Sequence, residues 1–326
     1  MSTRPQDIIK SFGETLLFAS INGFTDIVKL LLKDLAIDLK YTGNNGNTAL
    51  ILTCENGHAD IVELLLKNST IDVNYVNKYG DTALILACRK GHIDVVIELL
   101  KHPDININYG CDDDADAGWT ALLCACDEGH TNIVRLLIAH GADINKNTEY
   151  GWTALTTASA NGHTDIVEIL LKHGANANFA NEWGRTALSW ASEHGHADIV
   201  RLLLPYDNNV NQVDDNNRSP LIHASRNGHK SCVELILQHY DNNINHSDKY
   251  NHRTALIEAS EYGYADIVQL LIAHGADLDC TDKIGATALS WARYKSHPKI
   301  VQLLLDNGAD VDNSGYIYYF KGYKIK

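Results

Sequence analysis

Hydrophobic and polar positions follow one pattern along the chain that recurs about every 33 residues. Each period opens with Thr-Ala-Leu and a short apolar segment, continues through Gly-His, and ends with a second apolar segment of the form Ile-Val-x-x-Leu-Leu. The opening residues are Thr48, Thr82, Thr120, Thr153, Thr186, Ser219, Thr254 and Thr287. Such regular spacing indicates an array of one repeated structural unit rather than two ordinary domains.

The residues of one period predict two short helices and a turn. The opening threonine can cap a first helix, which we expect to end at the glycine of Gly-His because glycine tolerates left-handed backbone. The second helix, residues 60–67 in one copy, is apolar almost all round and must be covered by neighbouring copies. Glycines ahead of the threonines, such as Gly80 and Gly184, predict hairpin-like turns between units. The sequence therefore predicts an all-α solenoid of about nine helix-turn-helix units that is stabilised by stacking.

These motifs resemble the ankyrin repeat family, whose consensus reads Thr-Pro-Leu-His-x-Ala, then Gly-His, then Gly-Ala-Asp-Val-Asn. The resemblance covers roughly residues 13–312, with alanine in place of the consensus proline in most copies. The expected units lie near 14–44, 45–78, 79–116, 117–149, 150–182, 183–215, 216–250, 251–283 and 284–312. Residues 1–13 are expected to form an N-terminal cap. The aromatic and basic segment 313–326 is interpreted as a C-terminal cap, with a short docking segment as the alternative.

Charge and composition narrow the functional classes. The 326 residues contain 41 Asp and Glu against 27 Lys and Arg, a net charge of −14, which argues against binding to nucleic acid or to anionic lipid. No segment approaches the roughly 20 apolar residues that span a bilayer. Seven cysteines at no disulfide-framework spacing favour a reducing, intracellular compartment, cytoplasmic or nuclear. A capped array of this kind is expected to be monomeric.

Residues that could carry catalysis or bind a metal are accounted for by the repeat. Most of the 16 histidines occupy the Gly-His position or the end of the second helix, and the others form no metal-ligand spacing. Cys54, Cys88 and Cys126 share one small-residue position, whereas Cys111 lies in a loop and is the best candidate for a reactive thiol. Phosphate-binding, nucleophile-elbow and zinc-protease motifs are absent from the sequence. We therefore expect a non-enzymatic protein without cofactor or metal.

Aromatic and arginine residues gather at the predicted turns, where the helix core does not need them. Because Trp, Tyr and Arg dominate the energetics of interfaces, they predict a contact surface for a protein or peptide. The alternative is that these rings stack on one another and stiffen the hairpins. The resemblance implies that the turns and the first helices together form the concave binding face. The candidate residues are Tyr79, Trp119, Tyr150, Trp152, Trp183, Arg185 and Arg218.

Two further features modify this picture. The third unit carries extra residues that include Asp112, Asp113 and Asp114, and this acidic insertion favours a basic partner. The ankyrin resemblance also implies that Asn74 and Asn145 match the acceptor pattern of an intracellular asparaginyl hydroxylase, with a purely turn-shaping role as the alternative. Both features belong to a protein-binding scaffold. The alternative function is a host-directed effector or adaptor whose C-terminal segment recruits a second partner.

Overall fold

A computed structural model of the chain describes residues 5–33, 37–111, 117–206, 209–239 and 243–311. Within these ranges the protein contains eighteen α-helices, one 3₁₀ helix at Leu204–Tyr206 and no β-strand, so the predicted all-α fold is confirmed. Isolated β-bridges close individual turns, as between Asn147 and Thr153. Residues 112–116, which include the acidic residues of the insertion in the third repeat, and the predicted C-terminal segment at 313–326 lie outside the described residues.

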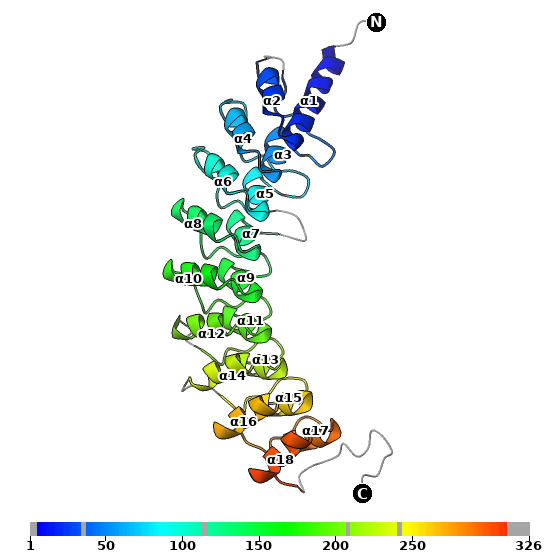
Figure 1. The fold of residues 1–326 in the computed structure, drawn as a ribbon, viewed down its shortest axis with the longest axis vertical. Helices are drawn as coiled ribbons and strands as arrows, with labels where there is room; N and C mark the ends of the chain where they lie inside the picture. Colours follow the sequence, from blue (N-terminus) through cyan, green and yellow to red (C-terminus); the bar gives the residue numbers. More distant parts are fainter. Residues whose placement is uncertain (1–4, 34–36, 112–116, 207–208, 240–242, 312–326) are drawn as a thin grey trace. The chain divides into compact units, whose positions relative to one another are not determined.

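The chain divides into two compact units, of which the first comprises Met1–Ala158 with Lys172–Ala175. In this unit the first helices of successive repeats (α1, α3, α5, α7) pack on one another, and the second helices (α2, α4, α6, α8) form a parallel layer (Figure 1). Its helices are α1 (Pro5–Asn22), α2 (Thr25–Leu31), α3 (Ala49–Glu55), α4 (Ala59–Leu66), α5 (Ala83–Lys90), α6 (Ile93–Leu100), α7 (Ala121–Asp127) and α8 (Thr131–Ala139). Helix α1 includes residues of the predicted N-terminal cap (1–13) and of the first predicted repeat (14–44).

The second unit comprises Ser159–Leu171 with Asn176–Lys326. Helices α9 (Ala154–Asn161) and α10 (Thr164–Lys172) lie at the division between the units. The same two layers recur within the second unit, from α11 to α17 and from α12 to α18. Its helices are α11 (Ala187–His194), α12 (Ala197–Leu203), α13 (Pro220–Arg226), α14 (Lys230–Leu237), α15 (Ala255–Tyr262), α16 (Ala265–Ala273), α17 (Ala288–Tyr294) and α18 (Pro298–Asp306).

From α3 onward, the first helices begin as their sequence predicts. The hydroxyl of Thr82 accepts a hydrogen bond from the backbone N–H of Ile85, and Ser219 caps α13 in the same way through Ile222. Helix α5 ends at Gly91, whose φ of 76° lies in the left-handed region. The buried faces supply fully enclosed aliphatic side chains such as Leu84, Leu99 and Leu137. Local capping and burial between repeats therefore agree on where the helices begin and end.

Histidines of the Gly-His pairs link one repeat to the preceding one, as in His58, His92, His196 and His229. The Nε2–H of His229 donates to the carbonyl of Glu193 at 2.9 Å, and that of His92 donates to Glu55 at 3.0 Å. The imidazole lies directly over the glycine of the preceding pair, so that a Cβ on Gly195 would stand 2.5 Å from the His229 ring. These histidines therefore form structural bridges between neighbouring repeats, in agreement with the prediction that the repeat explains them.

Candidate partner-binding site

Three of the predicted aromatic residues lie at the tips of the turns between repeats. Tyr79 and Tyr150 in the first unit and Trp183 in the second are exposed. The turn beneath each tip is stabilised locally: Asn181 Oδ1 accepts hydrogen bonds from the backbone N–H groups of Trp183 and Arg185, at 3.1 and 2.9 Å. The tips therefore present aromatic rings to solvent on turns with a defined conformation.

Neighbouring tips within a unit are joined through their backbones. In the first unit the N–H of Glu149 donates to the carbonyl of Ala117 at 3.1 Å. In the second unit the N–H of Asp215 donates to Trp183 at 3.0 Å, and that of Lys249 donates to Asn216 at 2.8 Å. Such bonds fix each tip relative to the next. We call the tips of each unit its tip row, which includes Tyr79 and Tyr150 in the first unit and Trp183, Tyr250 and Ile284 in the second.

The other predicted residues occupy the position immediately before each helix-capping residue. Trp119 and Trp152 hold it in the first unit, where both side chains are half-buried. Arg185, Arg218 and Arg253 hold it in the second unit. The predicted residues thus fall into two neighbouring rows, one at the tips and one at the starts of the first helices.

Arg185 and Arg218 form ion pairs with carboxylates of the protein itself. The Arg185 guanidinium is bonded to the Glu193 carboxylate and lies 3.7 Å from the centroid of the Trp190 ring. Arg218 Nη2 lies 3.6 Å from Asp248 Oδ2 in the following turn. Arg185 is therefore paired within its own repeat, whereas Arg218 links its repeat to the following one. A partner would contact either arginine as part of its ion pair.

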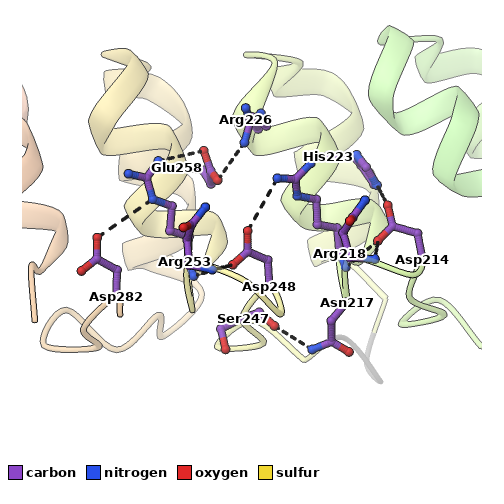
Figure 2. Close-up of polar contacts among 12 residues, drawn as sticks. Asp214, Asn217, Arg218, His223, Arg226, Ser247, Asp248, Arg253, Glu258 and Asp282 are labelled. Carbon is purple, nitrogen blue, oxygen red and sulfur yellow. Dashed lines mark hydrogen bonds and ion pairs between the residues drawn. The ribbon is translucent and has the colours of Figure 1, made fainter. Parts of the chain in front are cut away.

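These contacts belong to a larger cluster, the polar strip, formed by Arg218, Arg226, Asp248, Arg253, Glu258, Glu261, Asp282 and Lys295. Figure 2 shows Arg218 and Arg253 reaching from their turns toward carboxylates of the same and the following repeat. Arg253 is bonded to Glu261 and lies 4.4 Å from the Trp291 ring centroid. Arg226 Nη1 donates to Glu258 Oε1 at 3.2 Å. Alternating charges thus connect α13, α15 and α17.

Glu258 and Asp248 are the most enclosed members of the polar strip, each with a side chain that is 0% exposed. Burial raises the pKa of Glu258, and the nearby Arg226 and Arg253 only partly offset that effect. Glu258 Oε2 accepts no hydrogen bond, since the closest Arg253 nitrogen is 4.0 Å away. The folded chain therefore holds the Glu258 proton more tightly than an unfolded chain would.

This raised pKa predicts how the effect of Glu258→Gln on stability depends on pH. Stability from a carboxyl whose folded pKa is raised is present below its unfolded pKa and is lost as the pH rises through the folded pKa. Glutamine mimics the protonated form at every pH. We therefore expect the free energy of unfolding of Glu258→Gln, relative to wild type, to increase between pH 4.5 and 7.5. Urea denaturation at several pH values measures the difference, and a decrease with pH would contradict the expectation.

Asp214 and His223 form a second buried pair beside the strip. His223 Nε2 lies 3.0 Å from Asp214 Oδ2, and the other Asp214 oxygen accepts from the backbone N–H of Arg218 at 2.9 Å. Burial acts to raise the pKa of Asp214, but the bonds from His223 and from the turn hold it below its usual value. This carboxylate is therefore a charged anchor of the turn rather than a candidate general base.

The two predicted hydroxylation sites lie in the loops that follow the second helices. Asn74 Nδ2 donates to the carbonyl of Asp104 at 2.7 Å, while its Oδ1 accepts from the N–H of Asn106 at 2.8 Å. Asn145 Nδ2 donates to Gly174 at 3.2 Å. Both side chains thus support the adjacent loop. Their hydroxylation stays a prediction, for which the mass of one added oxygen per site is the readout.

Cys111, the best candidate for a reactive thiol by its place in a loop, is buried. Its side chain is 1% exposed, and Sγ lies 3.1 Å from the carbonyl oxygen of Tyr79, to which it donates. A thiolate nucleophile needs access to its substrate, and this position offers none. The loop is folded against the preceding tip, which spacing along the chain does not reveal. Across the described ranges, no group of three or more His, Cys, Asp and Glu side chains is arranged to hold a metal ion.

Asp112, Asp113 and Asp114 lie outside the described residues, so their role stays a prediction. Sequence reasoning missed His223, Glu258 and the bridging role of the Gly-His imidazoles. One signal was present for the paired arginines: an acidic residue follows Arg185 and Arg253 at the same separation of 8 residues. Asp81 and Arg89 repeat that separation with the charges exchanged.

Comparison with known proteins agrees with this architecture. A family model described as ankyrin repeats in three copies matches residues 16–110, 107–181, 173–248 and 239–314. No curated protein matches the sequence. Within the part of the chain that the structure describes, no helix is both long and apolar enough to cross a membrane. Repeats of this family are generally protein–protein interaction modules. Because the matches cover most of its length, the chain belongs to the ankyrin repeat family.

Proposed function

We propose that this chain is a non-enzymatic scaffold that binds a protein or peptide partner through its tip rows and the adjacent starts of the first helices. The observation that carries the proposal is the repeated exposure of aromatic side chains at Tyr79, Tyr150 and Trp183. An exposed ring costs free energy in water that a partner can recover by covering it. Large aromatic side chains are also the residues in which binding energy concentrates.

The tip rows suit rigid recognition. Backbone bonds between consecutive tips, such as Lys78 to Asn45 at 3.0 Å and Lys283 to Asn251 at 2.8 Å, order the surface before a partner arrives. A preordered surface loses little conformational entropy on binding. The chain would therefore bind with small backbone changes. We further propose that it acts as an intracellular monomer and that its partner is neither nucleic acid nor a membrane.

Removing three tryptophans should abolish capture of the partner. In Trp119→Ala/Trp152→Ala/Trp183→Ala the tip at residue 183 and two neighbouring positions lose their rings, and each lost anchor typically costs about 1–2 kcal/mol of binding. We expect proteins captured from cell lysate by the wild-type chain to be depleted at least tenfold on the variant, as measured by mass spectrometry.

The comparison requires that the variant be folded. Matching helical circular dichroism and melting curves provide that control. Equal capture by two folded chains would contradict the assignment of recognition to these positions, and no specific capture by the wild-type chain would contradict the scaffold function.

A further inference from the structure

We infer that the second unit binds an acidic peptide segment on a cationic face formed by Arg226, Lys249, Lys283 and Lys295. The inference rests on the proposed scaffold function and specifies the chemistry of the partner for this part of the molecule. The partner proposed here has the opposite charge to the one expected for the acidic insertion of the third repeat, which favours a basic partner. The net charge of −14 gives no sign of this face, because it counts buried and exposed charges alike. Here the negative charges are buried and the positive charges reach solvent.

The polar strip is layered by charge. Its carboxylates are enclosed: the side chains of Asp248 and Glu258 are 0% exposed, and that of Glu261 is 10% exposed. Two of the cations bonded to them still reach solvent, with Arg226 33% and Lys295 41% exposed. Figure 2 shows Arg226 on the α13 side of Glu258, with Asp248 and Asp282 in the turns below. A partner would therefore meet positive charge with the compensating negative charge beneath it.

The last two tips carry further exposed cations. Lys249 and Lys283 are exposed at corresponding places in successive turns. The backbone N–H of each donates to the preceding turn at 2.8 Å, so the two ammonium groups project from a fixed ladder. Asp215 holds the corresponding position one turn earlier and is exposed. That reversal of sign limits the cationic face to the turns and first helices that follow residue 215.

Aromatic rings accompany these cations. The Lys249 ammonium lies 5.7 Å from the Tyr250 ring centroid, and the Lys295 ammonium lies 5.8 Å from that of Tyr294. The Arg226 guanidinium lies 5.6 Å from the ring of Tyr262. All three tyrosines are exposed. A ring beside a cation orients the charge and supplies apolar area, so the face suits carboxylates that alternate with apolar or aromatic side chains.

An acidic peptide fits this face better than nucleic acid does. Binding of a nucleic acid backbone depends on many simultaneous phosphate contacts, whereas the exposed cations here are few and two are already paired with buried carboxylates. Exposed acids, including Glu234 and Asp266, lie on the second helices of the same unit. A long polyanion would encounter them, while a short peptide confined to the first-helix side would not.

The test is selection from a random 12-residue peptide library on the immobilised full-length chain, followed by titration of the most enriched peptide. We expect enriched sequences to carry net negative charge and at least one aromatic residue. Lys249→Glu/Lys283→Glu should weaken binding of that peptide about tenfold, because two exposed charge contacts become repulsive. Lys230→Glu/Lys299→Glu is the matched control, since it makes the same change in net charge on exposed residues of α14 and α18.

The possible outcomes separate this inference from the scaffold function. Neutral or basic enriched peptides, or acidic peptides that both variants bind equally, overturn the cationic face while leaving the scaffold intact. If a random 30-nucleotide single strand binds more tightly than the enriched peptide, and Lys249→Glu/Lys283→Glu abolishes that binding, the face belongs to nucleic acid and the proposal of an acidic peptide is overturned. Enrichment of no peptide by the folded chain contradicts both proposals. Circular dichroism of each variant confirms that the comparison is between folded proteins.

Discussion

Replacing Gly195 with alanine is expected to lower the free energy of unfolding by about 3–4 kcal/mol. Gly195 has a φ of 79°, which alanine adopts at a cost, and the new Cβ would stand 2.5 Å from Nδ1 of His229. The imidazole cannot move away without losing its 2.9 Å hydrogen bond to the carbonyl of Glu193. The substitution therefore disturbs the helix end and the bridge to the next repeat together. Denaturation in urea, followed by circular dichroism, measures the loss.

Gly275→Ala separates the two contributions. Gly275 has a similar φ of 85°, but a Cβ there would have no neighbour within 4 Å. This control should show only the backbone cost, about 1–2 kcal/mol. Equal destabilisation by the two substitutions would contradict the account of the histidine as an inter-repeat bridge.

Replacing Arg253 with alanine is expected to cost about 3 kcal/mol of stability. Arg253 contacts Glu258 in its own repeat and Asp282 in the following turn, and it lies over the ring of Trp291. Its removal leaves Glu258 with Arg226 and Glu261 with Lys295, and it takes the Arg253 guanidinium away from Asp282. Removing a cation from buried carboxylates costs more than the original pairing contributes. Chemical denaturation of the full chain is the measurement.

Two comparisons sharpen the Arg253 prediction. Adding Glu258→Gln to Arg253→Ala should recover part of the loss, since the amide carries no charge to leave uncompensated. Lys299→Ala breaks an ion pair in which Lys299 and Asp266 are 78% and 64% exposed, and it should leave stability nearly unchanged. An Arg253→Ala chain as stable as Lys299→Ala would show that the polar strip does not hold the repeats together.

The sequence predicted those features that depend on neighbours along the chain. Thr82 and Ser219 cap their helices, and Gly91 ends its helix in the left-handed conformation, because short-range geometry determines all three. The apolar second helices were expected to be buried between copies for a similar reason. The repeat period also predicted the family, and with it the order in which the helices stack.

Contacts between repeats were harder to predict from the same residues. The bridge from His229 ends on a backbone carbonyl, which no residue type marks. Arg185 and Arg218 were interpreted as partner contacts because arginine is common at interfaces. In the structure they pair with Glu193 and Asp248, and these pairings depend on the side-chain directions within and between repeats. The burial of Cys111 likewise depends on how its loop folds against Tyr79.

We propose that aromatic residues at the turns of this ankyrin array bind a protein partner. The most direct measurement is titration of the purified captured partner against the wild-type chain and against Trp119→Ala/Trp152→Ala/Trp183→Ala. We expect the dissociation constant of the folded variant to be at least tenfold larger, since rings that anchor the contact are gone. An unchanged dissociation constant would contradict it and would assign these tryptophans to stiffening the turns.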